Sequence, residues 1–598
     1  MFEVVPPAVA LRAAPTAGPL TASEDPTLVK ALEKHAVKLE LLFGPGQFRP
    51  ERRVAGPRWT RARDSHLLYP YYQLREADGR SAEELFAGAG EIADDLRSVA
   101  DVDAVFGVPS TVLPVMDPSP TGGQIVPAPE AGMPTGDLSN LQGYLGDKGV
   151  NALAARGVLG AAGRGVRIVD IESAWCWRHE DLLNNIGGVI AGFPPEHDVS
   201  RRNHGTAVLG IMGADLNPFG TIGICPDAVL SGVSVHGPRS WGPAAAITAA
   251  ANALAPGDII LIELQRSGPG HEDRGPTDQY GSLAMEYWPE VFAAIRYATR
   301  NGIIVVEAAG NGSQQLDDDE HDERPKLFPL DWHNPFNVDD GPNSGAVLVG
   351  AGAPPRLGAD RPPDSRLGFS NWGARVDAQG WGEAVVTTGG TWKGRGDLAG
   401  GPDETRWYTK SFNGTSSAAP MVAGALACVQ GALRAAGHRP LTPAQAQRAL
   451  RETGARQSDA PGRPASQRIG TRPDIPSLIT WALQETPRTT GKRRKPMRVQ
   501  ITIDDSDGSV SASAADTARP GVESRNGGPD DSVTYWRGPF YFATATEAEE
   551  IELPGASSAE GRAPSIPWKG PRGPYFLVTE KQAQTLRLTS ADDANGEG

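Results

Sequence analysis

The chain has 598 residues, enough for several domains, and its hydrophobic content of 39% is enough for a large buried core. Its 57 basic and 72 acidic residues give a net charge of −15, which argues against a general affinity for nucleic acids. The cysteines Cys176, Cys225 and Cys428 have neither metal-site spacing nor a disulfide framework, so we expect no disulfide.

Residues 1–25 alternate proline and alanine with single charges and are expected to be disordered. They have no basic start and no sustained apolar run, so no secretory signal is visible. No stretch of the chain approaches about 20 apolar residues, which predicts that nothing spans a membrane. We therefore expect a cytoplasmic protein, although export by another route or a wrongly chosen start codon would look the same.

Residues 26–115 are predicted to form a small α+β unit. Strand-like alternation or helical spacing appears at 38–43 (strand), 67–74 (strand), 82–99 (helix) and 103–108 (strand). Residues 116–140, rich in proline and glycine, are expected to be an exposed linker.

A short apolar stretch, Gly165–Ile171, looks like a buried parallel strand with Asp170 near its end. Open α/β sheets place their sites at the C-terminal ends of such strands. Further along, His204 opens a small-residue helix that is apolar enough to be buried. A strand-end aspartate that caps a turn is the plain alternative for Asp170 alone.

The segment Asn413–Gly424 looks like a nucleophile mounted on a helix. Gly414 allows a tight turn, because a residue without Cβ enters strained backbone regions easily. Ser416 then stands where a long helix begins, so its Oγ is exposed and unpaired N–H groups point toward nearby negative charge. Taken alone, the segment also fits an ordinary helix start with a serine N-cap.

Asp, His and Ser in this chain order is the order found in subtilisin. Residues 141–484 accordingly resemble the catalytic domain of a subtilisin-like serine protease, a subtilase. Shorter matches to the family's motifs are His179–Leu182, Gly223–Pro226, Ala308–Gly312 and Phe369–Gly373. The resemblance implies a three-layer α/β domain with a mostly parallel sheet.

The resemblance implies a serine endopeptidase that works through an acyl-enzyme intermediate and needs no cofactor for its chemistry. Ser416 would be the nucleophile, His204 its base and Asp170 the carboxylate that orients the imidazole. The Asn311 side chain and the Ser416 N–H would bind the oxyanion.

The family holds its polypeptide substrate between two strand-like segments, an instance of strand addition. The corresponding residues here are Ser234, His236, Gly237, Leu264, Gln265, Arg266, Ser267, Gly268, Ala308, Ala309 and Gly310. The chain departs from the family pattern at Gln265–Ser267 and at Ile171–Glu172. These departures leave open which substrate side chains the protein would prefer.

Calcium is a second implication of the resemblance, because Gln142, Asp181 and Asn217 stand where the family draws side-chain ligands. The acidic run 316–323 is interpreted as a solvated loop. Calcium binding or selection of basic substrates are its alternatives.

The N-terminal unit resembles a subtilase prosegment, in which case cleavage would fall between residues 114 and 138. The alternative is a structural domain that is never removed. Residues 485–531 are expected to be a basic and polar linker, with a strand at 499–503 and disorder from 509 to 531. Residues 532–598 are expected to form a β-rich accessory segment.

The leading hypothesis is thus a monomeric endopeptidase, and whether it processes itself is left open by the two interpretations of the N-terminal unit. Its alternative is a regulated or weakly active protease-like binding protein. An esterase would share the triad chemistry but is disfavoured, because no Gly-x-Ser-x-Gly elbow frames Ser416.

Overall fold

The computed structural model describes most of residues 135–488, together with segments on either side. The gaps within that range are 196, 238–240, 272–277, 326–327, 356 and 392–394. The described N-terminal segments are 3–5, 8–13, 26–42, 71–76, 81–96, 99 and 102–113, and after residue 488 five strands are described. The chain divides into two compact units, Met1–Thr489 and Thr490–Gly598, and each is described by itself.

A seven-stranded sheet with the order β15-β14-β13-β10-β7-β9-β8 forms the centre of the first unit, and each neighbouring pair is parallel. Its strands are β7 (Arg167–Glu172), β8 (Ile186–Ala191), β9 (Val229–Ser234), β10 (Ile259–Ile262), β13 (Ile304–Ala308), β14 (Val347–Gly352) and β15 (Ala378–Trp381). The inner strands are rich in Ile, Val and Leu because both faces of the sheet are covered. Their C-terminal ends meet at one edge, where α/β folds place their sites.

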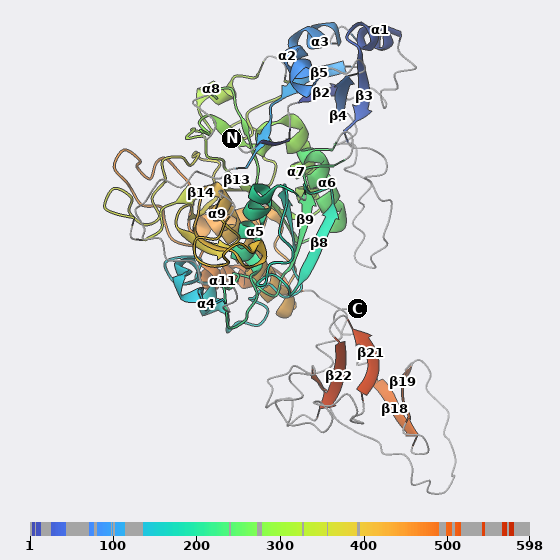
Figure 1. Cartoon of the computed structure of the whole chain (residues 1–598), viewed down its shortest axis with the longest axis vertical. Coiled ribbons are helices and arrows are strands. Elements are labelled where there is room, and N and C mark those ends of the chain that lie inside the picture. Colours follow the sequence, from blue (N-terminus) through green and yellow to red (C-terminus); the bar gives the residue numbers. More distant parts are fainter. Residues whose placement is uncertain are drawn as a thin grey trace. The chain divides into compact units, whose positions relative to one another are not determined.

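Helices cover both faces of this sheet and make three layers (Figure 1). The helices α5 (Val199–Gly213) and α9 (Thr415–Ala435) share a core with Leu261 of β10. On the opposite face, α6 (Pro243–Ala253) and α7 (Pro289–Arg300) share a core with the neighbouring Ile260. Successive strand side chains point to opposite faces, which explains the two cores. The predicted three-layer α/β fold is confirmed.

Helix α9 is buried along almost its whole length. Gly414, with φ of 88°, turns the chain into it. Gly424 lies so close to Ile224 that an added Cβ would come within 3.0 Å of that side chain. Among the described helices, α9 is long and apolar enough to cross a membrane, but all of its apolar window is buried inside the domain. It is therefore a core helix of this fold.

Smaller elements complete the domain. They are α4 (Ala152–Ala155), α8 (Asp319–Asp322), α10 (Pro443–Glu452), α11 (Ile475–Glu485), the antiparallel pair β16 (Val385–Thr388) and β17 (Tyr408–Phe412), and the 3-10 helices η2 (Ser139–Leu141), η3 (Gly143–Leu145), η4 (Met285–Tyr287) and η5 (Glu404–Arg406). The acidic run expected as a loop thus contains α8, whose N-cap is Asp318.

The N-terminal part forms an antiparallel sheet of order β3-β4-β2-β5 with three helices. Its elements are β2 (Ala8–Ala13), α1 (Pro26–Lys34), β3 (Val37–Leu41), β4 (Tyr71–Glu76), α2 (Ala82–Ala87), α3 (Ala89–Leu96) and β5 (Val102–Val108). The single helix expected at 82–99 is two helices. Strand β2 lies where we expected disorder, because β4 and β5 supply hydrogen-bonding partners on both of its sides. Residues 44–64 and 114–134 lie outside the described residues.

The second unit contains a hairpin and a three-stranded antiparallel sheet of order β20-β22-β21. Its strands are β18 (Arg498–Asp504), β19 (Ser509–Ala515), β20 (Tyr541–Ala543), β21 (Ser565–Gly570) and β22 (Gly573–Val578). The strand expected at 499–503 is part of β18. Strand β19 falls in the stretch expected to be disordered, because it pairs with β18 along its whole length.

Candidate active site

Three segments converge on one edge of the parallel sheet. Glu172 is the last residue of β7, His204 lies within α5, and Ser416 is the second residue of α9. All three side chains are buried. Helices α5 and α9 share one core with Ile168 of β7, so the three elements pack together on the same face of the sheet.

His204 is held by a carboxylate on one side. Its Nδ1 is hydrogen-bonded to Glu172 Oε2, and its Nε2 has no partner within the described part of the chain. With the Nδ1 proton donated to a carboxylate, Nε2 carries the lone pair and is able to accept a proton. The rings of Phe412 and His204 pack in a T-shaped arrangement, with 5.5 Å between centroids. The arrangement is that of an oriented general base.

Asp170 does not contact His204, contrary to our expectation. It lies two residues inside β7, where its Oδ2 accepts a 2.8 Å hydrogen bond from Trp175 Nε1. Burial, and then the charge of Glu172, raise the pKa of Asp170 well above its usual range. The position at the strand end and the longer side chain put Glu172 in the place that we assigned to Asp170.

Asn311 lies beside the start of α9. Its Oδ1 accepts hydrogen bonds from the N–H and the hydroxyl of Thr415, both 3.0 Å, one residue before Ser416. Its Nδ2 donates to Gln279 Oε1 at 3.0 Å and has a second hydrogen available. The side-chain amide is therefore fixed next to the predicted nucleophile.

Two carboxyl groups of this site, Glu172 and Glu263, were missed by the sequence analysis. Glu263 directly follows the apolar strand β10 and is fully buried. Each of the two glutamates closes an apolar strand at the C-terminal edge of the sheet. That position was the signal that could have found both.

The predicted substrate residues lie on three segments near the C-terminal edge of the sheet, but not all of their side chains are available to a substrate. Ser234 Oγ donates to the Ser173 carbonyl at 2.7 Å, and His236 Nε2 lies 2.8 Å from Ser173 Oγ. Gly237 packs against the Trp241 side chain. Leu264 is part of the core on the α6 and α7 face, so its side chain is not available to a substrate.

The remaining predicted substrate residues lie around Asn311. Ala308 ends β13, the Ala309 carbonyl accepts from Asn371 Nδ2 at 2.7 Å, and Gly310 has a φ of 94°. Gln265 Oε1 accepts the Asn311 N–H at 2.7 Å. The Gly268 N–H donates to the Gly281 carbonyl.

The strand expected to receive substrate is paired with the chain's own N-terminal part. Strand β11 (Gln265–Ser267) lies antiparallel to β6 (Thr111–Val112) on one side and β12 (Ser282–Ala284) on the other, and β1 (Glu3–Val5) pairs with the outer edge of β6.

Side chains reinforce the pairing between β6 and β11. Arg266 donates to Thr111 Oγ1 at 2.9 Å and to Glu290 at 2.6 Å, and it is buried. The Leu113 carbonyl accepts from Gln279 Nε2 at 3.3 Å. Residues 111–113 therefore lie alongside β11, the predicted substrate strand. The side chain of Gln279 links them to Asn311, because it is hydrogen-bonded to both Leu113 and Asn311.

The residues expected to bind calcium come together, but their oxygens are occupied. Asp181 accepts hydrogen bonds from Asn217 Nδ2 at 2.8 Å and from the Thr221 N–H at 2.7 Å. Gln142 Oε1 accepts the Ile222 N–H at 2.7 Å. Burial also raises the pKa of Asp181 to about 7. Calcium is held by several oxygens at once, and here N–H donors of the chain already occupy the side-chain oxygens of Gln142 and Asp181, so this donor set does not fit a calcium site.

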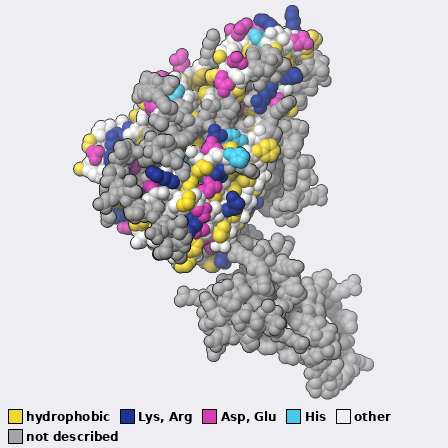
Figure 2. Space-filling model, in the orientation of Figure 1, with side chains coloured by type: hydrophobic (Ala, Val, Ile, Leu, Met, Phe, Trp, Pro, Cys, Tyr) yellow, Lys and Arg dark blue, Asp and Glu magenta, His cyan; other side chains and the backbone are white. Residues whose placement is uncertain are grey.

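The acidic run is used for structure as well. Asp317 accepts the Ala374 N–H, and Asp322 accepts the side-chain amides of Asn334 and Asn337. Within the described residues, no group of three or more His, Cys, Asp or Glu side chains is placed to hold a metal ion. On the described surface in view, acidic and basic side chains are interspersed (Figure 2).

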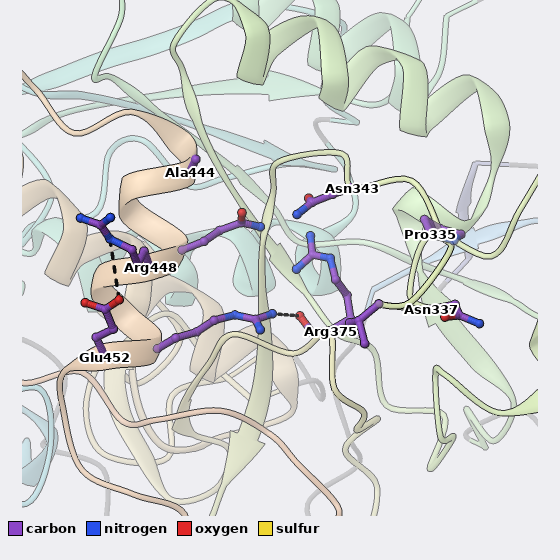
Figure 3. Close-up of a pocket in the computed structure, with 11 residues that line it drawn as sticks. Pro335, Asn337, Asn343, Arg375, Ala444, Arg448 and Glu452 are labelled. Atoms are coloured by element: carbon purple, nitrogen blue, oxygen red, sulfur yellow. Dashed lines mark hydrogen bonds and ion pairs between the residues drawn. The ribbon is translucent and has the colours of Figure 1, made fainter.

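A separate pocket of about 430 Å³ lies between α10 and residues 335–343 and shares no residue with the site above (Figure 3). Its walls include Arg375, Arg448, Arg451, Asn337, Asn343 and Gln447. Each arginine is already paired: Arg375 and Arg451 with Asp377, and Arg448 with Glu452 and Glu485. We assign no ligand to it.

Known proteins resemble the middle of the chain. Alkaline elastase YaB of Bacillus sp. strain YaB is 28% identical over 273 residues, which cover 45% of this chain and 56% of the elastase. An intracellular serine protease of Paenibacillus polymyxa is 28% identical over 285 residues, which cover 47% of this chain and 71% of that protease. The chain thus spans little more than half the length of the elastase.

A solved structure, that of fervidolysin from Fervidobacterium pennivorans, a keratinolytic enzyme related to subtilisin, aligns with a TM-score of 0.47 at 16% identity, over 86% of this chain and 68% of that one. The sequence profile of the Subtilase family matches residues 169–470, half of the 598 residues. By that match, the chain belongs to the subtilase family.

Proposed function

We propose that the protein is a serine endopeptidase whose triad is Ser416, His204 and Glu172. The observation that carries the proposal is the imidazole of His204, which is bound to Glu172 through Nδ1 and has Nε2 without a partner among the described groups. Membership of the subtilase family and the homologous proteases support the same reaction.

The reaction follows from the residue types. His204 Nε2 takes the Ser416 proton while Oγ attacks the peptide carbonyl, and it then returns that proton to the leaving amine. Glu172 fixes the imidazole tautomer and stabilises the imidazolium that forms. Water repeats the sequence on the acyl-enzyme and releases the acid.

The negative oxygen of each tetrahedral intermediate needs donors that are already in place. We assign them to the second hydrogen of Asn311 Nδ2 and to the N–H of Ser416. The fixed contact between Asn311 and Thr415 supports this assignment, because it holds the amide beside the helix start.

We also propose self-processing, in which the chain is cut between residues 114 and 138. The pairing of β6 with β11 supports it, since the chain reaches the predicted substrate strand immediately before that segment. The same pairing is the observation that favours the alternative, a binding protein in which the N-terminal part permanently covers the strand.

Labelling with a fluorophosphonate probe tests the proposal. We expect an adduct on Ser416 in the parent chain, none in Ser416→Ala, and hydrolysis of a peptide library by the parent only. Absence of both label and hydrolysis from the parent after prolonged incubation would favour the binding protein. Equal mass of parent and Ser416→Ala after that incubation would exclude self-processing.

A further inference from the structure

Glu263 is a buried acid at the centre of the site that the triad does not use. Its N–H donates to the Ile171 carbonyl at 3.3 Å, and the paired residues before it are Ile262 and Ile171. The next pair along the two strands is therefore Glu263 and Glu172, which point to the same face. Glu263 is 0% exposed, and neither of its carboxyl oxygens has a well-formed hydrogen bond with a described residue.

The groups that act on Glu263 come from two elements: Asp170 and Glu172 lie on β7, and Ser416 lies at the start of α9. His204 of α5 is linked to this group through its hydrogen bond with Glu172. The Ser416 hydroxyl is close enough to lower the pKa of Glu263, although burial and the charges of Asp170 and Glu172 raise that pKa well above its usual range. Within the described residues, no cationic side chain contributes to the shifted pKa of Glu263.

We propose that Glu263 is a positioning residue for the nucleophile: as a neutral carboxyl group it donates its O–H to Ser416 Oγ and leaves the serine proton directed at His204 Nε2. This inference rests on the proposed function. An uncharged carboxyl group has one donor, and a serine oxygen is able to accept one hydrogen bond while it donates another.

The ionised form of Glu263 would act in the opposite direction. A carboxylate only accepts, so it would draw the serine proton away from His204. It would also add a negative charge beside Asp170 and Glu172. Because the pKa of Glu263 is raised, the group is neutral at low pH and loses its proton as the pH rises. Activity should therefore fall on the alkaline side.

The test is the pH dependence of kcat/KM of the full chain, from about pH 5 to about pH 10, on a peptide that the parent cleaves. Glu263→Gln retains an N–H donor that does not ionise, so we expect near-parental kcat at neutral pH and loss of the alkaline decline. Glu263→Ala removes the donor, and kcat should fall about tenfold with little change in KM.

Glu307→Gln is the matched control. Glu307 is equally buried on the next strand, but it accepts from the Glu286 N–H and is influenced by Arg375, so the alkaline decline should remain. A parental decline in Glu263→Gln would overturn the proposal. So would equal losses of kcat in the Gln and Ala variants, which would indicate a structural role.

Folding and chemistry are separated by two measurements. Thermal melting shows whether each variant is folded, and the rate of fluorophosphonate labelling across the same pH range reports on Ser416 directly. If Glu263→Gln fails to fold while Glu307→Gln folds, the neutral acid is structural and the proposal is wrong. If the parent itself neither labels nor cleaves, it is the proposed function that fails.

Discussion

Two groups of buried acids lie on opposite faces of the same sheet, and they differ in how their charge is balanced. Beside the α5 and α9 face, Asp170, Glu172 and Glu263 are accompanied by one histidine. On the other face, Glu286, Glu307 and Asp377 surround Arg375, which pairs with Asp377 at 2.7 Å and with Glu286 at 3.3 Å.

The difference separates a site from a scaffold. Buried charges are normally paired, since an unpaired one loses its hydration without compensation. The group around Arg375 obeys that rule and joins segments of the chain. The group around Glu172 departs from it: burial raises the pKa of Asp170 and of Glu263 well above the usual range with no cation to offset the rise among the described residues, whereas Arg375 partly offsets the raised pKa of Glu307. Acids shifted in this way cluster at sites where protons are transferred.

The largest effect is expected in the group of Asp170, Glu172 and Glu263, which we call the unbalanced group. Glu172→Gln should lower kcat about 10⁴-fold, because an amide does not hold the imidazole tautomer or stabilise its cation as a carboxylate does. Asp170→Asn, two residues away on the same strand, should lower kcat far less. Steady-state kinetics of both variants decide the point, and the reverse order would restore Asp170 as the partner of His204.

Substitution in the balanced group, which is Arg375 with Glu286, Glu307 and Asp377, should change the stability of the protein rather than its chemistry. Arg375→Met leaves buried carboxylates without their cation and should lower the free energy of unfolding by about 3–5 kcal/mol. Its control is Arg361→Met, which breaks a more exposed pair with Glu383 and should lower it by less than about 1 kcal/mol. Urea unfolding measures both, and similar losses would refute the scaffold interpretation.

Among the described residues, no cation acts on Asp170 or Glu263, so the developing oxyanion is expected to depend on neutral donors. Asn311→Ala should reduce kcat by about 10²–10³-fold, while KM stays nearly constant. An unchanged kcat would remove Asn311 from the mechanism. Asn334→Ala serves as control, because this buried asparagine binds Asp322 and the Leu316 carbonyl rather than Thr415.

The smallest effect concerns Asp181, a buried acid outside both groups. Since hydrogen-bond donors of the chain already occupy its oxygens, a chelator should leave the melting temperature unchanged. A fall in the melting temperature that added calcium reverses would show that the predicted ligands rearrange around the ion.

Short local motifs in the sequence were enough to point to three of the residues that the structure brings together. His204, Asn311 and Ser416 stand in short small-residue motifs, and the structure brings all three to the site, although His204 lies inside α5 rather than at its start and Asn311 follows β13. The carboxylate was assigned wrongly because Asp170 and Glu172 alternate onto the same face, so periodicity could not distinguish them. The deciding fact was where β7 ends, and strand boundaries are the least predictable feature of a sequence.

Other differences arise from non-local pairing. Strand β2 was missed because its partners lie 59 or more residues away in the sequence, as the pairing of Arg12 with Tyr71 shows. The residues predicted as calcium ligands do lie close together. The sequence does not show that the backbone N–H groups of residues 221 and 222 donate hydrogen bonds to the side-chain oxygens of Asp181 and Gln142.

The pairing of β6 with β11 has a consequence for any enzymology on the intact chain. A segment tethered to the same molecule competes at an effective concentration on the order of millimolar, so an added peptide must outcompete it. The apparent KM of the uncut protein would then include the free energy needed to displace β6 from β11. Progress curves should show a lag, and the lag should shorten as the chain between residues 114 and 138 is cleaved.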